Sequence, residues 1–141
     1  MGLSYSGGFN MSIRGGCLCG KVKYKVSGQL GDADHCHCSM CRRQHGAAFG
    51  TYAACSADDF AWTEGKELVK TYETASGAGW VFCGECGSTL AGSDNGEVFG
   101  VTLGSVEGDP GVRPEAHIFV GSKAVWDVIT DDLPQYDERS P

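Results

Sequence analysis

Residues 35–41 read HCHCSMC, which places three cysteines within a single short stretch. Two tight pairs lie on either side of it, in GGCLCG at residues 15–20 and in FCGECG at residues 82–87. Seven of the eight cysteines therefore fall into three groups, and only Cys55 stands alone. What these groups bind decides how the chain folds.

Metal ions explain the cysteine spacing better than disulfides do. Residues one or two positions apart seldom meet disulfide geometry with each other, and a reducing cytosol opposes such bonds. A tight pair presents two thiolates to one ion, and two pairs from distant parts of a chain can close a tetrahedron around Zn²⁺. The sequence predicts metal binding.

The seven clustered cysteines are one ligand short of filling two metal sites with four ligands each. One partition gives a closed structural site, formed by Cys17, Cys19, Cys83 and Cys86. It leaves Cys36, Cys38 and Cys41 as an open site, and an open coordination position is typical of catalytic zinc. In the alternative, a further ligand closes the second site, with four candidates: Cys55, His35, His37 and His45. His37 is expected to point away from an ion shared by the cysteines on either side of it.

Composition limits the class of protein. A chain of 141 residues with 41% hydrophobic residues predicts one folded domain, and 22 glycines predict many turns and a β-rich fold. The net charge of −7 disfavours nucleic acid and anionic membrane surfaces as partners. The sequence has no apolar run long enough to span a bilayer and no recognisable leader, so we expect a cytoplasmic protein.

Hydrophobic patterning predicts short strands and one helix. We expect a flexible tail over residues 1–13, a single domain over 14–138, a short helix over 39–44 and an acidic, extended C-terminal stretch from residue 131. The expected strands cover residues 22–26, 49–53, 68–72, 80–82, 98–103 and 117–120.

Four longer motifs follow one another along the chain: GGCLCGKVKY, CHCSMCRRQHGAAFGTYA, FCGECGSTL and GVRPEAHIFVGSKAVWDVITDDLPQYDE. In these motifs and their order the chain resembles the glutathione-dependent formaldehyde-activating enzymes, whose domain is shared with centromere protein V. The resemblance implies a mainly β, Mss4-like fold of short antiparallel strands with two zinc ions. It also implies the partition given above, with the four-cysteine site structural and the three-cysteine site catalytic.

A zinc ion held by three thiolates suits a substrate thiol better than a water molecule, because a metal-bound thiol is deprotonated outright. The resemblance therefore implies a carbon–sulfur lyase that condenses glutathione, or another small thiol, with formaldehyde or a related aldehyde to an S-hydroxymethyl adduct. Binding of the aldehyde oxygen to zinc is the alternative mode. A non-catalytic zinc-stabilised domain that binds a protein partner is the alternative function, and the oligomeric state stays open.

An anionic thiol such as glutathione needs nearby cations and hydrogen-bond donors. The expected substrate-binding residues follow the cysteine triplet or lie near the last predicted strand: Arg42, Arg43, Gln44, His117 and Lys123.

Overall fold

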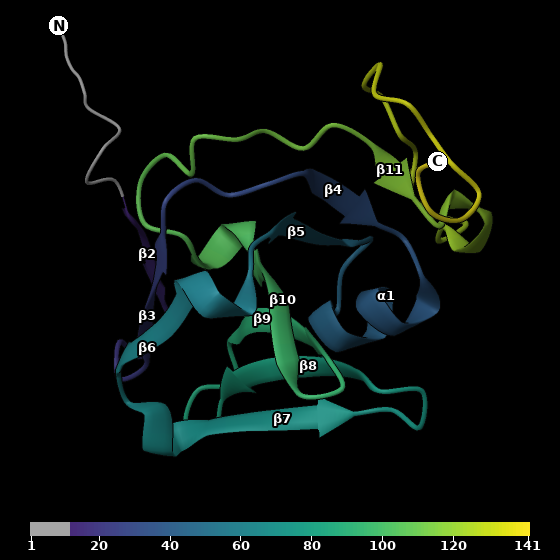
Figure 1. Ribbon diagram of the computed structural model, residues 1–141. Coiled ribbons are helices and arrows are strands. Elements are labelled where there is room, and N and C mark those ends of the chain that lie inside the picture. Colours follow the sequence, from purple (N-terminus) through teal and green to yellow (C-terminus); the bar gives the residue numbers. More distant parts are fainter. Residues whose placement is uncertain (1–11) are drawn as a thin grey trace, which may run out of the picture.

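The computed structural model describes residues 12–141, which form ten strands in two sheets and one α-helix (Figure 1). The smaller sheet has the order β2 (Ser12–Gly16), β3 (Lys23–Ser27), β6 (Phe60–Glu64). The larger sheet has the order β11 (His117–Ile118), β4 (Ala33–Cys36), β5 (Gly50–Ala54), β10 (Glu97–Thr102), β9 (Thr89–Asp94), β8 (Ala78–Cys83), β7 (Val69–Glu73). The expected mainly β fold with little helix is confirmed.

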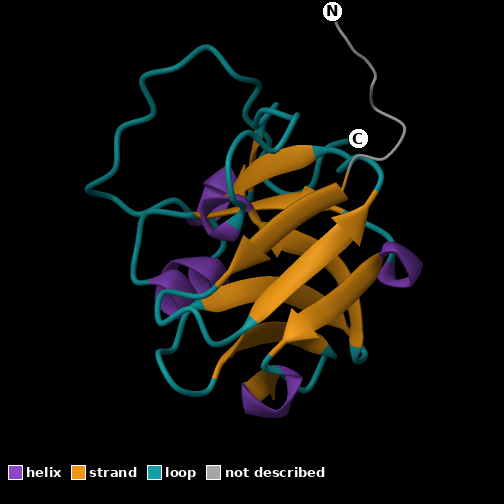
Figure 2. Cartoon of the chain, turned by 90° about the vertical axis from the view of Figure 1, so that its left-hand side faces the viewer, coloured by secondary structure: helices purple, strands orange, loops and turns teal. Residues whose placement is uncertain are grey.

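Helices lie at the margins of the strands (Figure 2). The α-helix is α1 (Ser39–His45), and four 3₁₀ helices cover Ala57–Asp59, Lys66–Leu68, Leu103–Ser105 and Val120–Ser122. No helix in residues 12–141 combines the length and the apolar character needed to cross a membrane.

The core lies between the two sheets. Tyr24 and Val26 alternate along β3 with half-buried neighbours, and both are buried against residues of the larger sheet. Leu90 of β9 and Val101 of β10 are fully buried on the other side of this core. Alternation with period two therefore turns one face of each sheet inward, and the apolar area removed from water holds the sheets together.

All six expected strands and the expected helix are present, with boundaries shifted by one or two residues in most cases. Four strands were not predicted: β2, β4, β6 and β9. Among the named strands of residues 12–141, the expected antiparallel pattern has one exception: β11 pairs with β4 in parallel and aligns Ile118 with Cys36.

Both ends of the domain differ from the sequence expectation. Strand β2 begins at Ser12, inside the expected tail, because Ile13 pairs with Val26 and is buried; the rest of that tail lies outside the described residues. The expected extended C-terminal stretch instead packs beside β11. The Tyr136 N–H donates to the His117 carbonyl, and the Phe119 N–H donates to the Glu138 carbonyl.

Candidate metal centres

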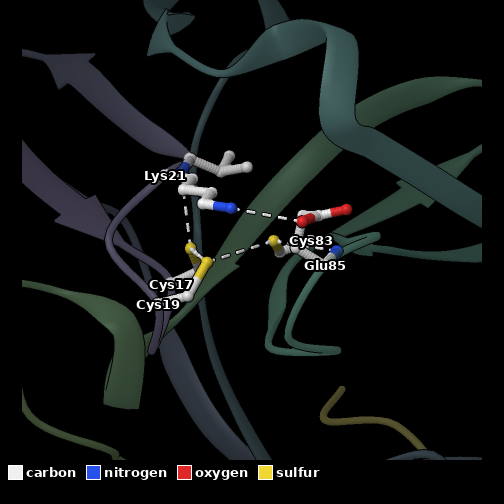
Figure 3. Close-up of polar contacts among 6 residues, drawn as sticks. Cys17, Cys19, Lys21, Cys83 and Glu85 are labelled. Carbon is white, nitrogen blue, oxygen red and sulfur yellow. Dashed lines mark hydrogen bonds and ion pairs between the residues drawn. The ribbon is translucent and has the colours of Figure 1, made fainter.

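The first cysteine cluster joins the two sheets. Cys17 and Cys19 lie in the turn between β2 and β3, while Cys83 ends β8 and Cys86 lies in the turn before β9. The sulfurs of Cys17 and Cys19 are 3.5 Å apart, and those of Cys19 and Cys83 are 3.9 Å apart (Figure 3). All four sulfurs lie within 4.8 Å of one another.

This geometry fits a tetrahedral zinc ion. Zn–S bonds of about 2.3 Å in a tetrahedron separate neighbouring sulfurs by about 3.8 Å. The separations in the cluster bracket that value, and all four donors are soft sulfur ligands. The residues present therefore fit Zn²⁺.

Polar contacts around the first cluster hold the two turns in place. The Val22 N–H donates to Cys17 Sγ and the Glu85 N–H donates to Cys83 Sγ, both at 3.3 Å. Such bonds stabilise thiolates. Lys21 Nζ lies 3.2 Å from Glu85 Oε1 and joins the same two turns (Figure 3).

The second cluster is built by the end of a strand and the start of a helix. Cys36 is the last residue of β4, Cys38 caps the N-terminus of α1, and Cys41 is buried in its first turn. The Cys41 N–H donates to Cys38 Sγ at 3.3 Å. The three sulfurs lie within 4.8 Å of one another, so this geometry also fits a metal ion.

Three thiols this close together can all be deprotonated only if a nearby cation offsets their negative charges. Hydrogen bonds from Cys36 and Cys41 lower the pKa of Cys38 to about 2, and the bond to Cys38 raises the pKa of Cys36 to about 11. One thiolate therefore forms at the expense of its neighbours. A divalent metal removes that conflict, because it favours the thiolate form of every ligand.

The two clusters differ in number of ligands and in surroundings. Among residues 12–141, neither Cys55 nor any histidine joins the three sulfurs of the second cluster as a further ligand. Cys36, Cys38 and Cys41 instead line a cavity of about 660 Å³. Other residues of its lining include Asp32, Asp34, Met40, Tyr52, Asp94, Trp80, Phe99, Ile118, Phe119 and Arg139.

The cavity lies on the face of the larger sheet that turns away from the core. Asp34 and Tyr52 line it, and they alternate with Ala33 and Ala53, which belong to the core. Burial, followed by the charge of Asp32, raises the pKa of Asp34. Burial also holds the pKa of Tyr52 above its usual range, so its hydroxyl keeps its proton.

His37 and His117 form a buried chain behind the second cluster. His37 is fully buried, and its Nε2 lies 2.8 Å from Nδ1 of His117. Nε2 of His117 lies 3.0 Å from the Asp131 carboxylate, whose pKa is lowered by that hydrogen bond. Neither histidine lines the cavity or joins the three sulfurs, which agrees with the expectation that His37 points away from a shared ion.

The five expected substrate-binding residues lie outside the lining of this cavity. His117 is only 2% exposed, in the buried chain. Arg43 is exposed, and three others contact the protein itself: Arg42 Nε donates to the Ser122 carbonyl at 3.1 Å, Gln44 Nε2 to Thr89 Oγ1 at 3.2 Å and Lys123 Nζ to the Asp127 carbonyl at 2.6 Å.

Sequence reasoning missed the acidic side chains and the C-terminal residue that line the cavity. Asp32 and Asp34 precede Cys36 at spacings of four and two, and this period-two spacing was a usable signal once β4 was recognised. Arg139 has no such signal, because it reaches the cavity only through the packing of the C-terminal segment, where its guanidinium lies 5.5 Å from the ring centre of Phe119.

Comparison with known proteins identifies the family. No curated protein matches the chain. A solved structure, the crystal structure of a Rhodobacter sphaeroides protein determined as a structural-genomics target, is 29% identical with a TM-score of 0.57, and the match covers 68% of this chain and 89% of that one. The family model described as "Glutathione-dependent formaldehyde-activating enzyme" matches residues 12–122. Because this match spans most of the chain, the protein belongs to the glutathione-dependent formaldehyde-activating enzyme family.

Proposed function

We propose that the protein is a cytoplasmic zinc enzyme that joins a small thiol, such as glutathione, to formaldehyde or a related aldehyde. The supporting observation is that the three-cysteine cluster lines a cavity of about 660 Å³, which is large enough for a small molecule. The cluster of Cys17, Cys19, Cys83 and Cys86 has a different role in this proposal, since it fixes the two sheets through a closed zinc site.

The reaction forms one carbon–sulfur bond. Cys36, Cys38 and Cys41 would hold Zn²⁺, which supplies a fourth coordination position and lowers the pKa of a thiol placed there. The substrate thiol loses its proton, its sulfur adds to the carbonyl carbon, and the carbonyl oxygen accepts a proton. The product is an S-hydroxymethyl adduct, and the reverse reaction is that of a carbon–sulfur lyase.

Tyr52 is the proton donor that we assign to the carbonyl oxygen. Its side chain lines the cavity together with the three cysteines, and its hydroxyl lies 2.8 Å from Nε2 of His45. This contact fixes the hydroxyl and gives it a partner for proton exchange. The aromatic rings of Trp80 and Phe99 on the same wall reduce the access of water.

Calorimetry of thiol binding tests this function. Glutathione should bind to the zinc-loaded protein with release of a proton at neutral pH, because coordination converts its thiol to a thiolate. The matched control is S-methylglutathione, which keeps the peptide and its charges but lacks the ionisable sulfur, and it should bind much more weakly. Titration in two buffers of different ionisation enthalpy measures the proton release. Equal affinities without proton release would favour a non-catalytic binding domain.

A further inference from the structure

The wall of the cavity carries an excess of negative charge. Asp32, Asp34 and Asp94 line it, whereas Arg139 is the one Lys or Arg side chain among its lining residues. Within residues 12–141, none of the three carboxylates forms an ion pair; the nearest polar contact is a 3.4 Å bond from Asn95 Nδ2 to Asp94. Arg139 offsets part of the charge of Asp34, and among the described residues the lining keeps an excess of negative charge.

The carboxylates of Asp32 and Asp34 form a row that leads to the three-cysteine cluster. Asp32 lies just before β4, and Asp34 and Cys36 follow at alternate positions within this strand. The side chains of all three residues therefore lie on one face, at intervals of about 6.6 Å. A ligand whose sulfur lies at the cysteine cluster would extend past these carboxylates. A positively charged group on that ligand would meet opposite charge, and a carboxylate would meet like charge.

The aromatic side chains on the wall also suit an ammonium group. Tyr52, Trp80 and Phe99 line the cavity, and aromatic faces attract organic cations.

We propose that the thiol substrate of this cavity carries an ammonium group, bound by Asp32, Asp34 and Asp94 beside the aromatic wall, so that aminothiols are preferred to thiols with an excess of carboxylates, such as glutathione. This inference rests on the proposed function, because it assumes that the sulfur lies at the three-cysteine cluster. In this proposal the substrate is recognised by carboxylates of the cavity and not by the cationic side chains of Arg42, Arg43 and Lys123, which were expected from the sequence.

Three small thiols of different charge provide the test: cysteamine, 2-mercaptoethanol and 3-mercaptopropionate, which are cationic, neutral and anionic. Their affinities for the zinc-loaded protein are measured by calorimetry in the original chain and in the double variant Asp32→Asn/Asp94→Asn. Because the acidity of the thiol differs along the series, each thiol is compared between proteins. The matched control, Asp58→Asn/Glu67→Gln, removes two exposed charges outside the cavity lining.

The double variant should weaken cysteamine binding about fivefold to tenfold, because Asp32 and Asp94 are exposed and two exposed ion pairs contribute roughly this much. Binding of 2-mercaptoethanol should stay within about twofold, and that of 3-mercaptopropionate should strengthen, whereas the control should change none of the three. Equal effects of the double variant on all three thiols would overturn the inference and leave the proposed function standing. Absence of proton release with every thiol, in the original chain, would overturn the proposed function itself.

Discussion

At the scale of single residues, two buried hydroxyls have opposite environments. Thr102 Oγ1 donates to the Thr89 carbonyl at 2.9 Å or to Ser105 Oγ at 2.8 Å, while the Ser93 hydroxyl has no partner among the described residues. Both side chains are nearly inaccessible, at 6% and 2% exposure. Removal of the two hydroxyls should therefore have different effects on the free energy of unfolding.

Ser93→Ala should leave the free energy of unfolding unchanged or raise it by up to about 1 kcal/mol, because it removes a buried group that lacks a hydrogen bond. Thr102→Val keeps the shape of the side chain but loses its hydrogen bonds, and it should cost about 1–2 kcal/mol. Urea unfolding of the ligand-free, zinc-loaded protein measures both. A loss of stability in Ser93→Ala equal to that in Thr102→Val would show that the Ser93 hydroxyl has a partner.

Tyr52 provides a residue-scale test of the chemistry. Tyr52→Phe should lower kcat of thiol–aldehyde condensation by ~10²-fold, because it removes the proposed proton donor, while thiol affinity changes less than about twofold. The control is Tyr24→Phe, which removes a hydroxyl that bonds Ser105 Oγ at 2.7 Å in the core, away from the cavity. Unchanged kcat in Tyr52→Phe would remove Tyr52 from the mechanism.

At the scale of elements, the ring of Tyr24 and the Ser105 carbonyl pack against β2 only because Gly15 has no side chain. A Cβ at this position would contact the phenol of Tyr24 and lie 2.6 Å from the Ser105 carbonyl oxygen. Gly15 pairs with Tyr24 across the two strands, so the ring of Tyr24 covers the position.

Gly15→Ala should therefore lower the free energy of unfolding by about 1–3 kcal/mol, as overpacking of a core does. Gly104→Ala is the matched control, since a Cβ there has open space, and its effect should stay within about 0.5 kcal/mol. Thermal unfolding of the two variants gives the comparison. Equal stability of the two would mean that Tyr24 and Ser105 move aside without cost.

Sequence patterns predicted the elements that have a local signal. The alternation of β3 is the clearest case, and the structure confirms this strand and the short helix expected after the cysteine triplet. Strands β4 and β9 were missed because their residues are small or polar, and their strand character comes from pairing with neighbours in the larger sheet. Both cysteine groupings were predictable from spacing, whereas the contribution of Arg139 to the cavity depends on tertiary packing and was not.

At the scale of the whole molecule, the two cysteine clusters occupy different structural positions. The four-cysteine cluster joins the β2–β3 turn to the β8–β9 turn, and therefore ties the small sheet to the large one. The three-cysteine cluster lies between β4 and α1 and lines the cavity. Loss of metal at the first should release the sheets from each other, while loss at the second should leave the core intact.

The most direct test of this division of roles is the zinc content per chain, measured with the thermal transition in the original protein, Cys38→Ala and Cys86→Ala. We predict two zinc ions in the original protein, and one in Cys38→Ala with a cooperative transition retained and no condensation activity. Cys86→Ala should not fold, because a structural zinc site contributes ~10 kcal/mol or more, comparable with the stability of a whole domain. A single zinc ion in the original protein, or unfolding of Cys38→Ala as complete as that of Cys86→Ala, would contradict the assignment.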